Sequence, residues 1–279
     1  MIRLTADSTC DLGEQIAKRG IGIKPLTVIL GGTPYSDGVD IVPQDIFNYV
    51  EKTGQLPKTA APSIADYEDF FRPYVEAGET VIHFSISSKA SSSYSYAAEA
   101  AKTFGGKVHV VDSKALSTGQ GLVIMMAADL RDAGASAEEI VEKANAVRPK
   151  VNTSFVPDRL DYLYKGGRCS RMALYGANLL KINPLIEMED GQLVAGKKYR
   201  GSMEKCIAQY VSDLAAKYPE YDRTRCFITH SNADESVIEV ARQKVKALFS
   251  FDEVLETVAG SVITGHCGRN TLGVLFIAK

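Results

Sequence analysis

Serine residues crowd one short segment of the chain, residues 85–94, which reads SISSKASSSY. The segment follows an apolar, β-branched run and precedes apolar residues at helical spacing, so we expect a strand-to-helix turn. Such a turn presents unpaired backbone NH groups and the positive end of a helix dipole, at the edge of the sheet where open α/β proteins bind ligands. Its hydroxyls add donors for the carboxylate of a small ligand. The simpler interpretation is that one serine caps the helix and the others face water.

A second polar loop is expected at residues 58–63, KTAAPS. Ser63 and Asp66 have the spacing of a helix N-cap and its N3 partner, so Ser63 is expected to be structural. Thr59 lies upstream of that cap and Pro62 stiffens the approach, which leaves the Thr59 hydroxyl free to face a ligand. A surface turn explains the same residues nearly as well.

Two glycine-containing segments supply the other candidates. In residues 260–268, GSVITGHCG, His266 is expected in a glycine-bounded turn. Its imidazole titrates near neutral pH, so it can pair with a carboxylate or assist phosphoryl chemistry. In residues 165–168, KGGR, Arg168 can hold an anion. Each has a plain alternative: a histidine satisfied by ordinary hydrogen bonds, and a surface arginine after a helix end.

The first half of the chain alternates short β-branched runs with helix-length amphipathic stretches. This is the pattern of parallel strands joined by crossover helices, which would position these residues. Strands are expected at residues 2–5, 80–84 and 107–111, with helices at residues 64–77, 93–104 and 115–133. A capping box at residues 136–139 opens one more helix, which ends near Pro149. We therefore predict a three-layer α/β/α domain with a mainly parallel sheet over residues 1–149.

The second half mixes hairpins with crossovers. We expect strands at residues 151–156 and 274–278 and a hairpin of residues 185–188 and 192–195 around the turn Glu189-Asp190-Gly191. This pattern predicts a two-layer α/β domain with a mixed sheet over residues 150–279.

Composition narrows the function. The chain has 279 residues, 45% of them hydrophobic, with 32 Lys and Arg against 34 Asp and Glu, so there is no strong field to gather nucleic acid. No apolar run reaches the length of a membrane span and no signal peptide is visible, so we expect a cytoplasmic protein. The cysteines and histidines show no disulfide framework and no ligand spacing, so no metal is expected; the cysteines are Cys10, Cys169, Cys206, Cys226 and Cys267.

Five short motifs together resemble the DegV family of fatty-acid-binding proteins over essentially the whole chain. They are Thr5-Ala6-Asp7-Ser8, Thr59-Ala60-Ala61-Pro62-Ser63, Ser87-Ser88-Lys89-Ala90-Ser91, Gly166-Gly167-Arg168 and Gly265-His266-Cys267-Gly268. The chain departs from the family pattern at Ser92, where a glycine is usual, and at Arg269-Asn270, where Pro-Gly is usual.

The resemblance implies a DegV-like two-domain fold that buries a long-chain fatty acid, such as palmitate or stearate, between its domains. Thr59 and Ser91 match the residues that hold the carboxylate. Some members present the fatty acid to a separate kinase subunit related to dihydroxyacetone kinases, and residues matching Arg168 and His266 are implicated in that step. The chain would then be a carrier rather than a catalyst, with no cofactor besides the bound ligand.

Simple energetics permit this function. Burying about fourteen methylenes yields on the order of 10 kcal/mol before ordering costs, and the carboxylate needs donors to leave water. Two other functions stay open. A serine hydrolase or acyltransferase would use a loop serine with His266, but the chain has no G-x-S-x-G elbow. A phosphotransferase-like module would bind a triose or sugar through His266, but no P-loop motif is present.

Overall fold

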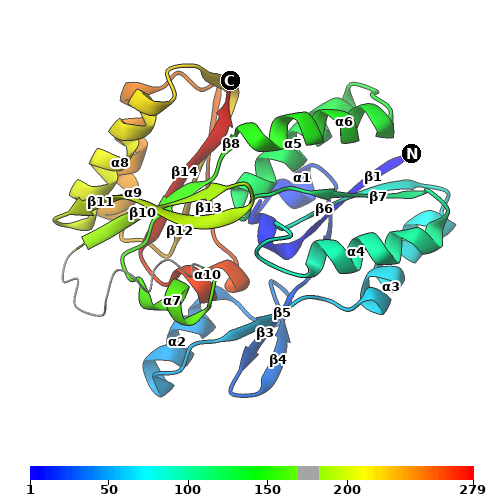
Figure 1. Ribbon diagram of the computed structural model, residues 1–279, viewed down its shortest axis with the longest axis horizontal. Coiled ribbons are helices and arrows are strands. Elements are labelled where there is room, and N and C mark those ends of the chain that lie inside the picture. Colours follow the sequence, from blue (N-terminus) through cyan, green and yellow to red (C-terminus); the bar gives the residue numbers. More distant parts are fainter. Residues whose placement is uncertain (169–181) are drawn as a thin grey trace.

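The computed structural model describes residues 1–168 and 182–279. Two β-sheets lie side by side, with helices packed around and between them (Figure 1). A third, small sheet lies below the larger ones in the view of Figure 1.

The first sheet has four parallel strands in the order β2-β1-β6-β7. Their bounds are β1 (Ile2–Asp7), β2 (Gly22–Lys24), β6 (Thr80–Ser85) and β7 (Val108–Asp112). Helices α3 (Ile64–Glu76) and α4 (Ser93–Ala101) cover one face, and α5 (Thr118–Asp132) and α6 (Ala137–Val147) cover the other. Alternate strand residues face these two cores, since Val81 packs with α3 and Ile82 with α5. The predicted three-layer α/β/α arrangement is confirmed.

The second sheet is mixed and has seven strands, in the order β11-β10-β9-β14-β12-β13 with β8 also paired to β14. Their bounds are β8 (Val151–Asn152), β9 (Ser154–Val156), β10 (Ile182–Glu189), β11 (Gln192–Arg200), β12 (Tyr221–Ser231), β13 (Glu253–Val258) and β14 (Thr271–Ala278). Helices α8 (Met203–Lys217) and α9 (Glu235–Leu248) cover one face. The predicted two-layer α/β arrangement with a mixed sheet is confirmed.

Helix α5 joins the two halves. Phe227 and Leu275 of the second sheet belong to the same buried cluster as Leu122 and Val123 of α5. The chain enters the second sheet at β8, directly after the 3-10 turn η3 (Arg148–Lys150). The division into domains at residue 149 stays a prediction, because the two halves share this core.

The small sheet was not predicted. It is antiparallel, in the order β4-β3-β5, and contains β3 (Thr27–Leu30), β4 (Thr33–Ser36) and β5 (Lys58–Ala60). The loop expected at residues 58–63 is therefore wrong at its start, because Thr59 lies in β5 and pairs with Val28. Three residues with a leading lysine and few β-branched side chains give no usable strand pattern. Helix α2 (Pro43–Thr53) packs beside this sheet.

Several boundaries also differ from the predictions. The helix expected from residue 115 begins at Thr118, since Ser117 has a positive φ of 52°. The strand expected over residues 151–156 is broken at Thr153 into β8 and β9. The remaining elements are η1 (Ser8–Cys10), α1 (Gln15–Lys18), η2 (Lys102–Phe104), α7 (Asp161–Lys165) and α10 (Ser261–Cys267).

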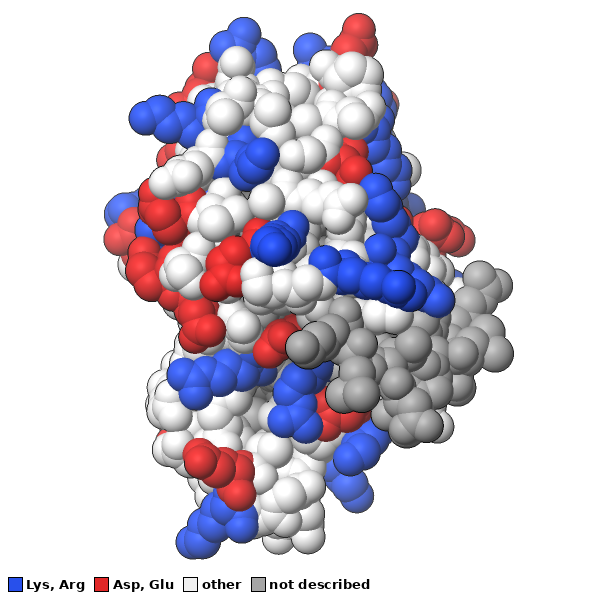
Figure 2. All heavy atoms as spheres, turned by 90° about the vertical axis from the view of Figure 1, so that its left-hand side faces the viewer, with Lys and Arg blue, Asp and Glu red and all other residues white. Residues whose placement is uncertain are grey.

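Charged residues of both signs share the surface. On the face shown in Figure 2, Lys and Arg side chains are interspersed with Asp and Glu side chains over the part formed by described residues. Within residues 1–168 and 182–279, no helix is long and apolar enough to cross a membrane. Four cysteines are buried free thiols, and Cys169 lies outside the described residues.

Candidate ligand-binding site

One cavity brings together the four polar residues singled out in the sequence. It has an empty volume of about 530 Å³, part of it open to solvent, and it lies where β5, the serine-rich turn, α7 and α10 meet. Its polar lining includes Thr59, Ser91, Arg168 and His266. The rest of the lining is mainly apolar: Leu26, Ala60, Ala61, Ile86, Ala90, Leu116, Leu163, Leu193, Val262, Ile263 and Cys267. We call it the outer cavity.

Thr59 and His266 form a hydrogen-bonded pair across this cavity. Thr59 Oγ1 lies 2.9 Å from His266 Nε2, although the two residues are 207 positions apart in the chain. Burial, together with the positive charge of Arg168, lowers the pKa of His266 to about 4, so the imidazole is neutral at neutral pH. If Nε2 carries the ring proton and donates it to Thr59, the hydroxyl proton of Thr59 is free for a ligand oxygen.

The segment around His266 is helical, not the turn expected from the sequence. Gly265 and His266 lie inside α10, and only Gly268, after the helix end, has a positive φ, of 77°. Gly265 is needed for close packing, because a Cβ there would lie 2.9 Å from Cγ of Pro57. The helix thus holds His266 on a fixed element that also contributes Val262, Ile263 and Cys267 to the cavity.

The serine-rich segment is the predicted strand-to-helix turn between β6 and α4. Most of its hydroxyls are engaged within the protein: Ser87 donates to the carbonyl of Gly191, and Ser88 donates to Asp112. The interpretation that all but one of these serines face water is therefore wrong. The N-cap residue, Ser92, makes no capping hydrogen bond through its side chain, whereas Ser91 Oγ accepts from Ser93 N at 3.2 Å. Ser91 Oγ lies 2.9 Å from Ser93 Oγ and lines the cavity.

Buried Asp7 holds this turn in place and was not recognised as a functional candidate by itself. It accepts hydrogen bonds from Tyr67 Oη (2.7 Å), Ser85 Oγ (2.6 Å) and Ile86 N (2.9 Å). Burial alone would raise the pKa of Asp7, but hydrogen bonds from His83, Ser85 and Tyr67 outweigh it and lower the pKa. An ionised Asp7 therefore ties the end of β6, and the start of the serine-rich turn, to β1.

Arg168 lies at the exposed rim of the outer cavity. Its Nη1 donates to the carbonyl of Gly166 at 2.7 Å, which turns the guanidinium back over α7. The positive charge near His266 and Thr59 favours an anionic group in the cavity. The residues that follow, from Cys169 on, lie outside the described residues.

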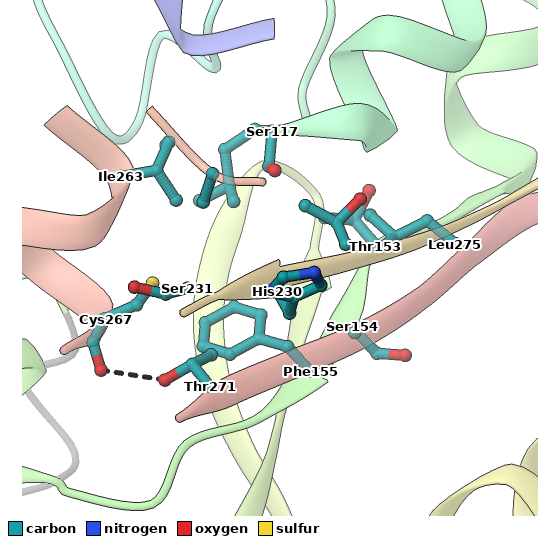
Figure 3. Close-up of a pocket in the computed structure, with 14 residues that line it drawn as sticks. Ser117, Thr153, Ser154, Phe155, His230, Ser231, Ile263, Cys267, Thr271 and Leu275 are labelled. Carbon is teal, nitrogen blue, oxygen red and sulfur yellow. Dashed lines mark hydrogen bonds between the residues drawn. The ribbon is translucent and has the colours of Figure 1, made fainter. Parts of the chain in front are cut away.

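A second cavity adjoins the first. Both are lined by Leu116, Ile263 and Cys267, and the second, which we call the inner cavity, has an empty volume of about 360 Å³, part of it open to solvent. In Figure 3, Ile263 and Cys267 lie on one side of the inner cavity and Thr153 and Leu275 on the opposite side. The shared residues place the two cavities next to each other, between Thr59 and His266 on one side and the second sheet on the other.

The polar side chains along the inner cavity are largely paired with protein groups. Ser117 donates to Asp11, Thr271 donates to the carbonyl of Cys267, and Thr229 Oγ1 lies 2.9 Å from Thr257 Oγ1. Among described residues, Thr153 Oγ1 has no partner, but a Cβ on Gly119 would lie 2.0 Å from it, so this hydroxyl packs against α5. Paired hydroxyls behave as a surface of low polarity, which suits an alkyl tail.

The described residues offer no metal site. No group of three or more His, Cys, Asp or Glu side chains lies close enough to hold an ion within residues 1–168 and 182–279.

Gly166 tests how closely His266 is packed. A Cβ at this position would lie 2.7 Å from His266 Nδ1 and 2.8 Å from the carbonyl of Tyr162. Gly166→Ala is therefore expected to push the imidazole away from Thr59 and to weaken ligand binding about ten-fold, the effect of a lost hydrogen bond at a charged group. The affinity of the purified variant for the ligand extracted from the wild-type protein measures this effect. Gly167→Asn, at a neighbouring positive φ with open space, is the matched control and should bind normally.

The whole chain is similar to proteins of one family. The model of the DegV family, described as uncharacterised proteins, matches residues 1–279. A DegV domain-containing protein of Clostridium acetobutylicum is 32% identical over 281 residues, which cover 100% of this chain and 99% of that protein.

Solved structures extend the comparison. A DegV family protein from Thermus thermophilus, described for its fatty acid binding, has a TM-score of 0.91 at 28% identity, over 100% of this chain and 99% of that one. A stearic acid-binding protein from Eubacterium ventriosum has a TM-score of 0.85 at 28% identity, over 100% of this chain and 99% of that one. Because both comparisons cover the whole chain, the similarity includes both large sheets.

Proposed function

This chain belongs to the DegV family, and we propose that it binds one long-chain fatty acid, with the carboxylate in the outer cavity and the tail in the inner cavity. The observation that carries the proposal is the convergence of Thr59, Ser91 and His266 on one cavity that continues into an apolar one. Structural relatives described as binding fatty acids support the same ligand class.

The head-group residues suit a carboxylate for a physical reason. A buried carboxylate needs donors, and neutral hydroxyls supply them without a fully buried counter-charge. Thr59 can donate when His266 Nε2 carries the proton, and Ser91 can donate if it rotates away from Ser93. Arg168 at the rim adds a favourable charge that remains in contact with water.

The tail supplies most of the affinity. Leu116, Ile263 and Cys267 line both cavities, so a tail that starts at Ser91 can pass along apolar side chains into the inner cavity, where Thr153 Oγ1 is a buried hydroxyl without a partner among the described residues. At about 0.8 kcal/mol for each buried methylene, the tail outweighs the cost of ordering the ligand. Palmitate and stearate are the ligands that we expect.

The chain is proposed to act as a carrier. His266 is paired with Thr59 rather than with a serine, and within the described residues its Nδ1 has no carboxylate partner. A hydrolase triad would need that carboxylate. The array of Thr5, His83 and Asp7 has triad-like spacing, but all three residues lie on β1 and β6, are fully buried and line neither the outer nor the inner cavity.

Presentation to a fatty acid kinase subunit is the finer part of the proposal. Arg168 and His266 lie at the rim and wall of the outer cavity, next to the site where the carboxylate would be phosphorylated. A cytoplasmic protein would meet such a kinase, and both the partner and the location remain proposals. We expect no cofactor beyond the fatty acid itself.

Solvent extraction of the purified protein tests the function directly. The extract is expected to contain about one long-chain fatty acid per chain, because about fourteen buried methylenes give slow release. Mass spectrometry of the extract, with quantification against protein concentration, makes the measurement. An extract without lipid, from protein that also fails to take up added palmitate, would contradict the proposal; binding of a triose or sugar instead would favour the phosphotransferase-like alternative.

A further inference from the structure

Two buried acids meet at the start of α10, outside the cavities. Gly260 N donates to Asp11 Oδ1 at 2.9 Å, and Ser261 N donates to Asp37 Oδ1 at 2.8 Å. Both acids are almost fully buried, at 5% and 3% exposure. A Cβ on Gly260 would lie 3.1 Å from Asp11 Oδ1 and 3.4 Å from both oxygens of Asp37, so the two carboxyl groups converge on this one residue.

The other oxygen of each acid is anchored to a different part of the first half. Ser117 Oγ donates to Asp11 Oδ2 at 2.6 Å, and Ser8 Oγ donates to Asp37 Oδ2 at 2.8 Å. Asp37 is held further by its own backbone, since its N donates to the carbonyl of Leu26 next to β3. The acids therefore connect the first turn of α10 to the small sheet and to the loop before α5.

This attachment bears on the head-group pair because of where its members lie. Thr59 is on β5 of the small sheet, and His266 is near the far end of α10. The helix and the small sheet are thus joined at two points: the Asp37–Ser261 hydrogen bond at the start of the helix, and the Thr59–His266 hydrogen bond near its end. Apolar contact of Val262 with Leu26 and Val28 lies between them.

This contact costs more free energy than a purely structural contact would need. Burying two acids side by side costs free energy that an apolar contact would not, and buried polar groups of this kind are often retained where geometry must be fixed. Hydrogen bonds from backbone NH groups fix both distance and direction, whereas apolar packing tolerates sliding.

We propose that Asp11 and Asp37 are positioning residues, which hold α10 so that His266 meets Thr59 in the geometry that receives a fatty acid carboxylate. The inference rests on the proposed function, since it takes the carboxylate as the group that the pair receives. Neither acid lines the outer cavity, so neither contacts the ligand there.

Comparison of palmitate with methyl palmitate tests this role, because the ester has the same tail and no carboxylate. Asp37→Ala is expected to weaken palmitate binding about ten-fold or more and methyl palmitate binding less than about two-fold. Asp37→Asn keeps an oxygen within reach of Ser261 N and is expected to stay within about two-fold of the wild type for both lipids. Each lipid is equilibrated with the delipidated full chain, and the bound fraction is measured by mass spectrometry.

Control variants distinguish loss of the His266 position from a general loss of stability. Ser136→Ala removes the cap of α6, far from α10, so it should lower the melting temperature without changing either affinity. Equal losses of acid and ester in Asp37→Ala, or no loss of either, would overturn the positioning role. A wild-type protein that binds neither lipid would instead overturn the proposed function. If Asp37→Ala does not fold, Asp37→Ser carries the same test, since its hydroxyl is too short to reach Ser261 N.

Discussion

Replacing Thr59 with valine and Ser91 with alanine together is expected to weaken fatty acid binding about 100-fold or more. Each hydroxyl would donate to a buried carboxylate, and a hydrogen bond to a charged group contributes about 1.5–3 kcal/mol. Valine keeps the shape of threonine, so β5 and its pairing with Val28 should persist. Loss of Thr59 also leaves His266 Nε2 without its hydroxyl partner, so the double variant removes both side-chain hydroxyls and disturbs the imidazole beside them.

Retention of fatty acid after delipidation and reloading measures this effect. Ser95→Ala is the matched control: Ser95 lies in α4, just after the turn that contains Ser91, but is exposed, and its hydroxyl donates to the carbonyl of Ser92. Wild-type retention in the double variant, with the control also unchanged, would remove both hydroxyls from the head-group role. The single variants should each lose less than the pair, although contact through His266 makes strict additivity unexpected.

Local sequence patterns located the large elements because those elements have strong local signals. Strands β1, β6 and β7 are short β-branched runs buried on both faces. Helices α3 and α6 begin at predicted capping boxes, in which Ser63 pairs with Asp66 and Ser136 with Glu139. The strand-to-helix turn at the serine-rich segment follows from the same two kinds of signal.

The small sheet gave no such signal. Strands β3, β4 and β5 are three or four residues long, and Pro34 and Lys58 are poor strand formers. These segments are strands only because they pair with one another, and local sequence patterns do not predict such pairing. As a result Thr59 was singled out as a candidate, but placed in a loop.

The contacts within the site are invisible to local patterns for a related reason. Thr59 and His266 are 207 residues apart, and Asp37 and Ser261 are 224 apart. Asp11 and Asp37 resemble ordinary solvated acids in the sequence, because nothing nearby in the chain shows that both are buried. Residue type and family resemblance indicate the four polar site residues, whereas the role of the acids that hold α10 becomes visible only in the folded structure.

Buried Asp11 gives the second large expected effect, on stability as a function of pH. Burial raises the pKa of Asp11 to about 8, with the neighbouring charge of Asp37 acting in the same direction. In the unfolded chain this carboxyl titrates near pH 4, so between pH 4 and pH 8 the folded state binds the additional proton. Stability must then fall as pH rises through this window, by about 1.4 kcal/mol for each pH unit.

Titration of two buried histidines opposes the effect of Asp11 in the lower part of this pH range. Burial lowers the pKa of His266 to about 4 and also lowers that of His230. At these two histidines the folded state therefore binds fewer protons than the unfolded chain below pH 6.5, and their contribution to stability rises with pH in that range. The two effects oppose each other below about pH 6.5 and leave Asp11 as the main contribution between pH 6.5 and pH 8. Burial also raises the pKa of Asp37, which acts in the same direction as Asp11.

Asp11→Asn should remove the decline above pH 6.5. Asparagine tolerates the positive φ of 51° at this position, accepts from Gly260 N, and can donate its amide proton to Ser117 Oγ. Melting temperatures at half-unit steps from pH 6 to pH 9 should fall for the wild type and stay nearly level for the variant, so that the variant is the more stable protein at pH 8.5. If the melting temperatures of wild type and variant instead change with pH in parallel, Asp11 is ionised at neutral pH. The two acids at the start of α10 would then both carry charge. In that case their repulsion would have to be outweighed by the hydrogen bonds that they accept from Gly260, Ser261, Ser8 and Ser117.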